Sequence, residues 1–330
     1  FESFSNIEHT TSKACKLDLS SCVSQTNLFP GQVVALRGVL TLRGVLQVKK
    51  IYSDISMKPE PIDFTEFSDN KTNSVKNDHH HLSIIIASGP FTLSSNLHYD
   101  PLKDLLKMVE EKKPNMLLLL GPFVDVSQEA TSSPDLDKTF DEIFKENFVT
   151  QLKKTSGNTK IVLIPSLSDA NQDLVYPQPT FLITSKKIES LPNPSLFSIN
   201  NFGGLVVGAT SLSVLNLLSK VQLSNQQNDK FTELATHLVN QKSFYPIMMN
   251  SDEVPLDYKL SGDYVRWGYS PHILVLPYQE AKAQFLHNGT LVVSTPPLVR
   301  NNSSGSYIEL DISLSDEKEL KENNVSMQVF

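Results

Sequence analysis

The sequence has few cysteines, no long apolar run and no cluster of basic residues, and each shortage excludes a class of protein. Its two cysteines, Cys15 and Cys22, are too few for a disulfide framework or a four-thiolate zinc site. Such sparing use of cysteine is typical of a reducing compartment, the cytosol or nucleus. No stretch of about eighteen apolar residues occurs, and no basic stretch precedes an apolar one at the start. We therefore predict neither a membrane span nor a signal peptide, and no membrane partner.

The chain also lacks an excess of positive charge. Its 29 Lys and Arg residues face 36 Asp and Glu, which gives a net charge of -7. Proteins that grip nucleic acid usually carry a basic stripe or patch, so we expect weak or no direct binding to nucleic acid. The first residue is Phe1 and not Met, from which we expect a fragment of a longer protein.

Common catalytic and metal-binding motifs are absent as well. The sequence has no His-Glu-x-x-His pair, no Gly-x-Ser-x-Gly turn, no Walker loop and no Gly-x-Gly-x-x-Gly fingerprint. Three consecutive histidines, His79, His80 and His81, cannot converge on one ion from a strand, because successive side chains point to opposite faces. No cofactor is expected.

The first part of the chain has the short alternating runs of a small β-structure. These runs are separated by Pro-Gly and Gly turn signals and cover residues 16–19, 33–39 and 45–52. From residue 53 to residue 81 the sequence turns polar and loses its periodicity. We predict a β-barrel segment at 1–52, a polar linker at 53–81 and a second domain at 82–330.

The second domain alternates buried strands with amphipathic helices. Apolar runs predict parallel strands at 83–87, 116–120 and 160–164, and later strands at 205–207, 273–276, 291–293 and 307–312. A helix after the first strand has Asp100 as its expected cap and Pro114 as its end, and a second helix spans Phe140 to Leu152. The pattern predicts a layered α/β domain around a central sheet.

The turns after the first three strands are where such a sheet would hold ligands or catalytic groups. A binuclear phosphoesterase would need carboxylates, histidines and an amide there. The turns consist mostly of Gly, Pro, Phe and Leu, and only Asp125 and Asp169 are candidate metal ligands. Two carboxylates without histidine partners make a weak site, and we interpret each as the cap of a turn or helix.

The same turns carry a family resemblance. The blocks are Phe-Pro-Gly-Gln at 29–32, Ser-Gly-Pro-Phe at 88–91, Gly-Pro-Phe-Val-Asp at 121–125, Pro-Ser-Leu-Ser-Asp at 165–169, Tyr-Pro-Gln-Pro at 176–179, Gln-Lys-Ser-Phe-Tyr-Pro at 241–246 and Pro-His-Ile-Leu-Val-Leu-Pro at 271–277. In this order they resemble the B subunits of DNA polymerase alpha, inactive relatives of the calcineurin-like phosphoesterases. The Tyr-Pro-Gln-Pro block favours the alpha complex over those of polymerases delta and epsilon.

The resemblance implies a partial oligonucleotide-binding (OB) barrel packed on a phosphoesterase-like domain that has lost its metals. The implied degenerate metal positions are Gly89, Phe91, Pro122, Asp125, Leu167, Ser168 and Asp169. A later histidine ligand corresponds to Ser243, and the last metal-binding turn to the region 277–280. No catalytic, metal-binding or cofactor-binding residue is expected.

The resemblance also implies a function. We expect a non-enzymatic nuclear scaffold of the polymerase alpha-primase complex, or primosome, which binds the C-terminal domain of the polymerase catalytic subunit, and primase indirectly, in DNA replication. Two alternatives remain at this point. The barrel could bind single-stranded DNA, with charge from Arg37, Arg43, Lys49 and Lys50, or the chain could be a metal-dependent phosphodiesterase.

Overall fold

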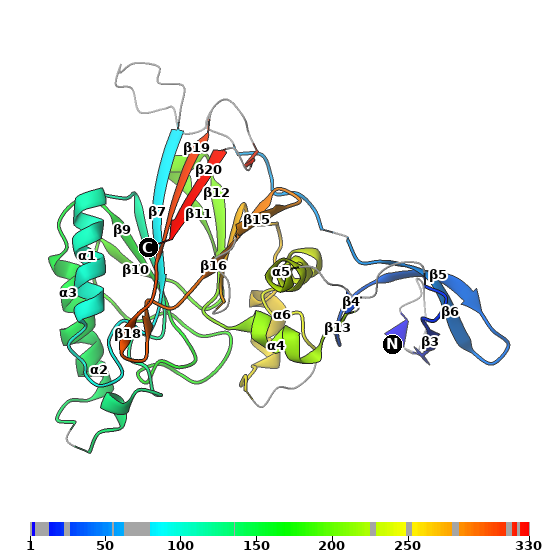
Figure 1. Cartoon of the computed structure of the whole chain (residues 1–330), viewed down its shortest axis with the longest axis horizontal. Coiled ribbons are helices and arrows are strands. Elements are labelled where there is room, and N and C mark those ends of the chain that lie inside the picture. Colours follow the sequence, from blue (N-terminus) through cyan, green and yellow to red (C-terminus); the bar gives the residue numbers. More distant parts are fainter. Residues whose placement is uncertain are drawn as a thin grey trace.

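The structure is a computed structural model. It describes residues 2–3, 13–22, 27–54, 56–62, 80–134, 136–224, 229–248, 253–278, 284–314, 319–321 and 324–329. Most of the chain forms a main body of two sheets packed face to face, each covered on its outer face by helices, and a smaller N-terminal segment projects from one side (Figure 1). The layered α/β fold class is confirmed, but the prediction of one central sheet is wrong.

The first sheet has the strand order β10-β9-β8-β7-β19-β20. Strands β7 (His80–Ser88), β8 (Met116–Leu120), β9 (Lys160–Ile164) and β10 (Ile188–Ser190) run parallel. Strand β19 (Ile308–Leu314) is antiparallel to both of its neighbours, β7 and β20 (Val325–Val329). Side chains of β7 alternate: Ile85 faces the helices, and Ile84 and Ile86 face the second sheet. Burial on both faces explains why these strands are almost continuously apolar.

The helices of the first layer lie outside this sheet. Helix α1 (Asp100–Lys112) buries Leu102, Leu105, Leu106 and Val109 on one face. Its N-cap is Tyr99 with no side-chain cap bond, so the prediction that Asp100 caps the helix is wrong: Asp100 is the first helical residue and bonds Lys103 at 2.8 Å. The second predicted helix is continuous over α2 (Phe140–Glu142), a π-helical segment (Ile143–Val149) and α3 (Thr150–Lys154). Thr139 and Glu142 form a capping box at its start.

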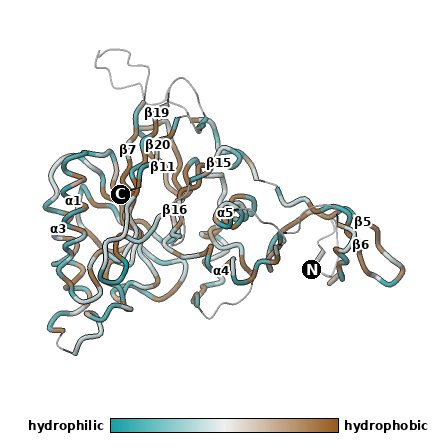
Figure 2. Tube along the Cα trace, in the orientation of Figure 1, coloured by the Kyte–Doolittle hydropathy of each residue, from teal (hydrophilic) through white to brown (hydrophobic). Residues whose placement is uncertain are grey.

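The second sheet has the order β11-β12-β14-β16-β15. Its parallel centre consists of β12 (Leu205–Ala209), β14 (Ile273–Pro277) and β16 (Thr290–Thr295), flanked by antiparallel β11 (Ser195–Ile199) and β15 (Gln284–His287). The helices α4 (Val214–Val221) and α5 (Lys230–Gln241) cover its outer face, and α6 (Tyr258–Tyr264) lies nearby (Figure 1). Hydrophobic residues follow the buried strands of the body (Figure 2). A short hairpin joins β17 (Val299–Arg300) to β18 (Ser303–Ser304).

The N-terminal segment contains a three-stranded sheet of order β3-β6-β5, with β3 (Lys16–Asp18), β5 (Ala35–Leu40) and β6 (Val45–Tyr52). The strands predicted at 16–19, 33–39 and 45–52 are thus present with small shifts at their ends. The pair β1 (Glu2–Ser3) and β2 (Lys13–Ala14) is separate. Three strands do not close a barrel, and the OB assignment stays a prediction.

A short strand joins this segment to the body. Strand β4 (Asn27–Leu28) pairs with β13 (Leu223–Ser224), which follows α4. Part of the predicted linker is also held against the body: His272 bonds the carbonyl of Glu60, Ser270 bonds that of Met57, and Ile62 is fully buried between the sheets. Residues 63–79, including His79, lie outside the described residues, and the domain boundaries stay a prediction. Within the described ranges, no helix has the length and apolar character needed to cross a membrane.

Candidate functional site at the carboxyl edge of the first sheet

The turns that follow β7, β8 and β9 meet at one edge of the first sheet. The backbone N–H of Gly89 donates to the carbonyl of Leu120, and that of Gly121 donates to the carbonyl of Ile164, both at 2.8 Å. Asp125 and Asp169 form an isolated backbone bridge. The two acidic candidates from the sequence therefore lie side by side, in turns of neighbouring strands.

The carboxylate of Asp169 forms its hydrogen bonds with backbone groups inside the protein. Its Oδ1 accepts the backbone N–H groups of Phe123 and Val124, the latter at 3.1 Å, and its Oδ2 accepts the N–H of Ser166 at 2.8 Å. The side chain is 3% exposed. A carboxylate held by three backbone donors joins the turn after β8 to the turn after β9, and it has little left to offer a metal ion.

Burial raises the pKa of Asp169 to about 7, against the opposing effect of its three N–H donors, and the nearby carboxylate of Asp125 raises it further. Near pH 7 about half of these groups are thus protonated, whereas an exposed aspartate would be fully ionised. The burial of Asp169 and its hydrogen bonds to backbone N–H groups both fit a structural role for this side chain.

Asp125 also bonds locally. Its Oδ1 accepts the N–H of Ser127 at 2.9 Å and the Ser127 hydroxyl at 2.8 Å, which is the geometry of a side-chain turn. Its backbone carbonyl accepts the hydroxyl of Thr131. This bonding agrees with the interpretation of Asp125 as the cap of a turn.

Close backbone contacts fill the space between the first two turns. A Cβ atom on Gly89 would lie 2.0 Å from the carbonyl oxygen of Pro122, and a Cβ on Gly121 would lie 2.4 Å from Oδ2 of Asp169. Both Gly89 and Gly121 precede cis prolines, Pro90 and Pro122. The turns therefore pack too tightly for any residue other than glycine at positions 89 and 121.

Phe91 and Phe123 point into an aromatic cluster beneath the edge. Their rings stack with centroids 5.5 Å apart, and both rings contact Phe148 from the π-helical segment. Phe91 is fully buried. The Tyr99 hydroxyl donates to the carbonyl of Phe123 at 2.8 Å, and burial raises the pKa of Tyr99 well above its ordinary value. At position 91 the structure therefore has a core side chain, which cannot bind a metal.

The remaining predicted positions carry no ligand set either. Leu167 packs against the core between the second sheet and its helices, and the carbonyl of Ser168 accepts the N–H of Val126. Ser243 comes much later in the sequence, and its hydroxyl accepts the N–H of Tyr245. Of the region 277–280, Pro277 ends β14, and residues 279–280 lie outside the described residues. The correspondence of these positions to former metal ligands stays a prediction.

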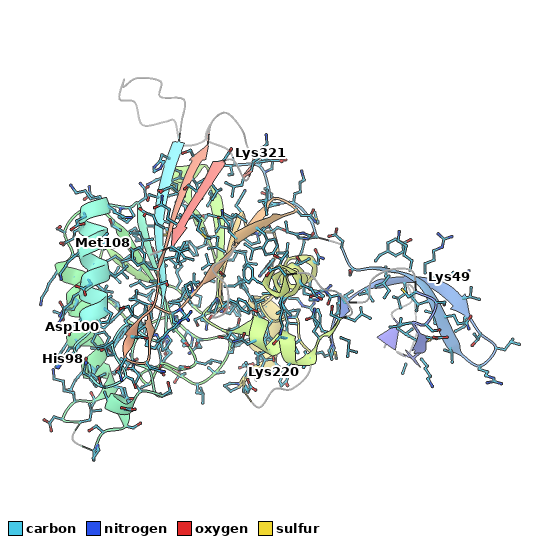
Figure 3. The ribbon with its side chains drawn as sticks, in the orientation of Figure 1. Lys49, His98, Asp100, Met108, Lys220 and Lys321 are labelled. Atoms are coloured by element: carbon cyan, nitrogen blue, oxygen red, sulfur yellow. The ribbon has the colours of Figure 1, made fainter. Side chains whose placement is uncertain are left out.

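The described histidines do not gather at this edge. His98 is exposed close to Asp100 at the start of α1, as Figure 3 shows. His81 lies 3.6 Å from Asp311. Nδ1 of His272 accepts the N–H of Val206, so the ring carries its proton on Nε2 and donates it to the backbone carbonyl of Glu60. Burial lowers the pKa of His272, which favours this neutral form. Among the described residues no group of three or more His, Cys, Asp or Glu side chains could hold a metal ion.

A neutral hydrogen-bond network, which sequence reasoning missed, links this edge to the second sheet. The Asn193 amide makes four hydrogen bonds, to Gln178, Thr210 and the side chain and backbone of Ser211. Gln178 in turn donates to the carbonyl of Ser166 at 3.0 Å. All four side chains are at least nine-tenths buried. Only Gln178 fell in a block noted from the sequence, and no spacing signal marks Asn193 or Thr210.

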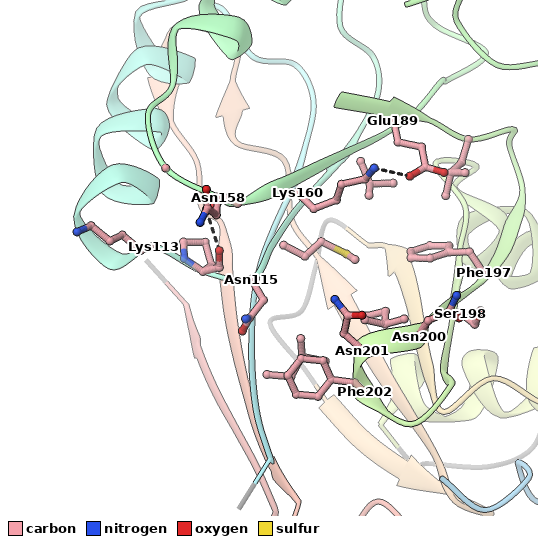
Figure 4. A pocket seen from close by; sticks show the side chains of 18 residues that line it. Lys113, Asn115, Asn158, Lys160, Glu189, Phe197, Ser198, Asn200, Asn201 and Phe202 are labelled. Carbon is pink, nitrogen blue, oxygen red and sulfur yellow. Dashed lines mark hydrogen bonds and ion pairs between the residues drawn. The ribbon is translucent and has the colours of Figure 1, made fainter. Parts of the chain in front are cut away.

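A different cavity, of about 880 Å³, opens at the opposite end of the strands (Figure 4). Its lining mixes apolar residues such as Met116 and Phe202 with several asparagines, and its Lys160 pairs with Glu189 at 2.8 Å. Asn115 accepts the N–H of Ser83. These groups stabilise the strand ends, and they form no acid, base and nucleophile arrangement.

The sequence was compared with protein families and with known proteins. Residues 84–285, well over half of the chain, match the family described as the B subunit of DNA polymerases alpha and epsilon. The chain belongs to this family. The DNA polymerase alpha B subunit of Dictyostelium discoideum is 30% identical over 332 residues, covering 96% of this chain and 48% of that protein. The B subunit from Bos taurus is 27% identical over 281 residues, covering 82% and 44%. The chain thus spans about half the length of the curated relatives it matches.

The solved structures that match this chain include a novel archaeal phosphodiesterase, which is 10% identical, covers 76% of this chain and all of that one, and has a TM-score of 0.34. Another is Vacuolar Protein Sorting 29 from Cryptosporidium parvum, 14% identical, covering 76% and 98%, with a TM-score of 0.32. These likenesses are weak and say nothing about activity.

Proposed function

We infer that this chain is a non-catalytic accessory subunit of the DNA polymerase alpha-primase assembly, acting in the nucleus in the initiation of replication. Its membership of the B-subunit family supports this inference. The observation that carries it is Asp169: both oxygens of this buried carboxylate are engaged by backbone N–H groups. An active binuclear enzyme needs charged oxygen ligands open to the metal.

The partner we propose is the C-terminal domain of the polymerase catalytic subunit, with primase joined indirectly. A scaffold needs a surface that keeps its shape, and the contacts between the N-terminal segment and the body support this. The Gln241 amide donates to the carbonyl of Val33 and accepts its N–H, at 3.0 and 2.8 Å. The N–H of Met248 donates to the carbonyl of Pro30. The two parts can therefore offer one continuous surface.

The test is co-expression of this chain with the C-terminal domain of a polymerase alpha catalytic subunit, followed by size-exclusion chromatography in about 0.5 M salt. The Debye length is then only about 4 Å, so association through exposed charges alone is lost. A permanent complex that buries more than about 2,000 Å² around an apolar centre would survive. We expect a one-to-one complex in a single peak. Separate elution at both high and low salt would refute the assignment.

A second candidate function is single-strand binding by the N-terminal segment. One observation favours it: the Lys50 ammonium lies 4.7 Å from the ring centroid of Tyr52, and Arg37, Arg43 and Lys49 are exposed in the same hairpin. Exposed cations beside an aromatic ring suit a stacked base and its phosphate. The net charge of -7 opposes it, so we expect weak, strongly salt-dependent binding. A submicromolar dissociation constant by fluorescence anisotropy at near-physiological salt would place this function first.

A further inference from the structure

The first sheet ends at strand β20, and the outer edge of this strand is open. In the strand order β20 is outermost, and it pairs with β19 alone (Figure 1). Within the described ranges, the backbone of residues 325–329 has no hydrogen-bond partner on its other side. The unpaired N–H and C=O groups of such an edge are a template for pairing with a further strand.

Strand β20 lacks the features by which proteins protect an exposed edge. Its sequence is Val-Ser-Met-Gln-Val, without a charged residue, a proline or a glycine, and its pairing with β19 has no bulge. Other edge strands of the chain are protected: β10 carries Glu189, β5 carries Arg37, and β15 is held against helix α5 by the contact of His287 with Asn240. The edge of β20 is therefore the one most open to pairing in the described part of the chain.

The apolar layer between the two sheets is incompletely covered at this edge. Val325, Met327 and Val329 pack against the core between the sheets, but each is only half-buried. Ser326 and Gln328 alternate with them and are exposed on the outer face. A strand added beyond β20 would cover the half-buried apolar row and continue the sheet.

The sequence of β20 is complementary to itself when two copies run antiparallel. A two-fold axis at Met327 places Val325 opposite Val329 of the second copy, and Ser326 opposite Gln328 of the second copy. Apolar residues then meet apolar residues on the inner face, and polar residues meet polar residues on the outer face. Strand β11, with the sequence Ser-Leu-Phe-Ser-Ile, is also uncharged, but the same operation about its central residue sets Ser against Ile and Leu against Ser.

The charged residues around β20 do not oppose this pairing. Glu309 and Asp311 lie on the outer face of β19, one strand away from the edge, and they contact Lys112 and His81 of the same chain. Glu319 precedes the strand and forms its ion pair within the chain. The two-fold axis thus sets no like charges opposite one another in the paired strands.

We propose that a second copy of this chain pairs with β20, antiparallel and centred on Met327, so that the two first sheets become one continuous sheet. The self-complementary sequence selects a second copy, because a strand of an unrelated polypeptide would need no such symmetry. Five residues on each side bury less than the roughly 1,200–2,000 Å² of a standard interface, so the dimer is weak, with a Kd of about 10–100 µM. The proposal does not depend on whether the polymerase catalytic chain is a partner.

Sedimentation equilibrium of the whole chain measures this association. Samples between about 2 and 200 µM span the expected Kd. We expect the weight-average mass to lie near the 36.8 kDa of one chain at the lowest concentration and to rise toward twice that value at the highest.

Two double variants test the register as well as the edge. Ser326→Lys with Gln328→Lys sets lysines opposite each other twice across the axis, and should weaken the dimer at least about tenfold. Within one chain these lysines lie beside Asp311 and Glu309, so the fold is retained. Ser326→Lys with Gln328→Glu changes the same positions but sets opposite charges together, so the dimer should persist and become sensitive to about 0.5 M salt.

The matched control is Val39→Lys, which adds a lysine at an exposed position of the edge strand β5 and should leave the Kd unchanged. Circular dichroism and urea unfolding at low micromolar concentration confirm that each variant is folded.

Several results would overturn the proposal. One is a parent chain that remains monomeric at about 200 µM. Another is a dimer that the two-lysine variant does not weaken, or that the Lys and Glu variant fails to preserve, because the edge or the register would then be wrong. Loss of the dimer in Val39→Lys would place the contact on β5 instead.

A monomeric parent chain whose complex with the catalytic-subunit fragment is lost in the two-lysine variant would assign the edge to another polypeptide, and would also overturn the proposal. At the low micromolar concentrations of the co-elution test the dimer is largely dissociated. Failure of that test would therefore leave the sedimentation result unaffected, so the two proposals fail separately.

Discussion

Replacing Asp169 should cost more stability than replacing any ordinary surface acid. Asp169→Ala removes the acceptor of three backbone N–H groups, those of Phe123, Val124 and Ser166. At about 1–1.5 kcal/mol for each lost bond, we expect a loss of about 3–4.5 kcal/mol at pH 4, where the contribution of this group is complete. Asp169→Asn keeps one oxygen for two of the donors and should cost about 1–1.5 kcal/mol.

The pH dependence of this cost has a definite sign. The pKa of Asp169 is about 7 in the folded chain and near 3.9 for an unfolded aspartate. Between these values the folded state holds more protons than the unfolded state, so the contribution of this group to stability is complete below about pH 4 and is lost as pH rises through 7. The slope is about 1.4 kcal/mol per pH unit. Asp169→Asn should therefore cost less at pH 8 than at pH 5.

Urea unfolding followed by circular dichroism measures these differences. The control is Asp125→Ala, which removes a neighbouring acid that accepts two hydrogen bonds from Ser127 and should cost about 2 kcal/mol, less than Asp169→Ala. If Asp169→Ala costs less than about 1 kcal/mol at pH 4, the carboxyl group does not hold the two turns together. The structural interpretation of this edge would then be wrong.

Three further predictions concern the same body. Gly89→Ala should destabilise the fold by about 2 kcal/mol or more by thermal unfolding, because the new Cβ meets the Pro122 carbonyl at 2.0 Å; an unchanged Tm would contradict this packing. Tyr99→Phe should cost about 1 kcal/mol in urea, since it orphans the carbonyl of Phe123, and a neutral effect would show that water replaces the hydroxyl. Burial lowers the pKa of His237 to about 4, so the contribution of this residue to folding stability is complete above about pH 6.5 and is lost as pH falls toward 4, by about 1.4 kcal/mol per pH unit. His237→Gln should therefore reduce the pH dependence of the unfolding free energy in urea titrations, and an unchanged pH dependence would show that His237 is not its source.

The central strands of the two sheets were well predicted because they are buried on both faces, whereas the edge strands β10, β11, β15 and β20 were not predicted. Continuous apolar runs at β8 and β9 indicated their bounds directly. The prediction of one sheet was wrong because an apolar run shows that a strand is buried but does not show which strand it pairs with. Strands β12, β14 and β16 have the same apolar pattern as β7, yet they pair with one another in a second sheet. The predicted N-cap, Asp100, was wrong by one residue. The actual N-cap, Tyr99, has a left-handed backbone conformation with φ of 57°, and a tyrosine in the sequence gives no indication of such a conformation.

The site was only partly predictable for a related reason. The lack of imidazole at the strand ends could be read from residue types, and so could the two surviving acids. That Asp169 accepts three N–H groups from two different turns depends on how β8 and β9 align, which no local pattern contains. The network around Asn193 joins loops that border both sheets, and no local pattern indicated that the second sheet existed.

The carboxyl edge of the first sheet is, in our interpretation, structural and not catalytic. Isothermal titration of the chain with Mn²⁺, combined with hydrolysis of a model phosphodiester, tests this most directly. We expect no binuclear binding and no turnover above background, in the parent chain and in Asp125→Ala alike. Two ions bound with micromolar affinity, or turnover that Asp125→Ala abolishes, would contradict it.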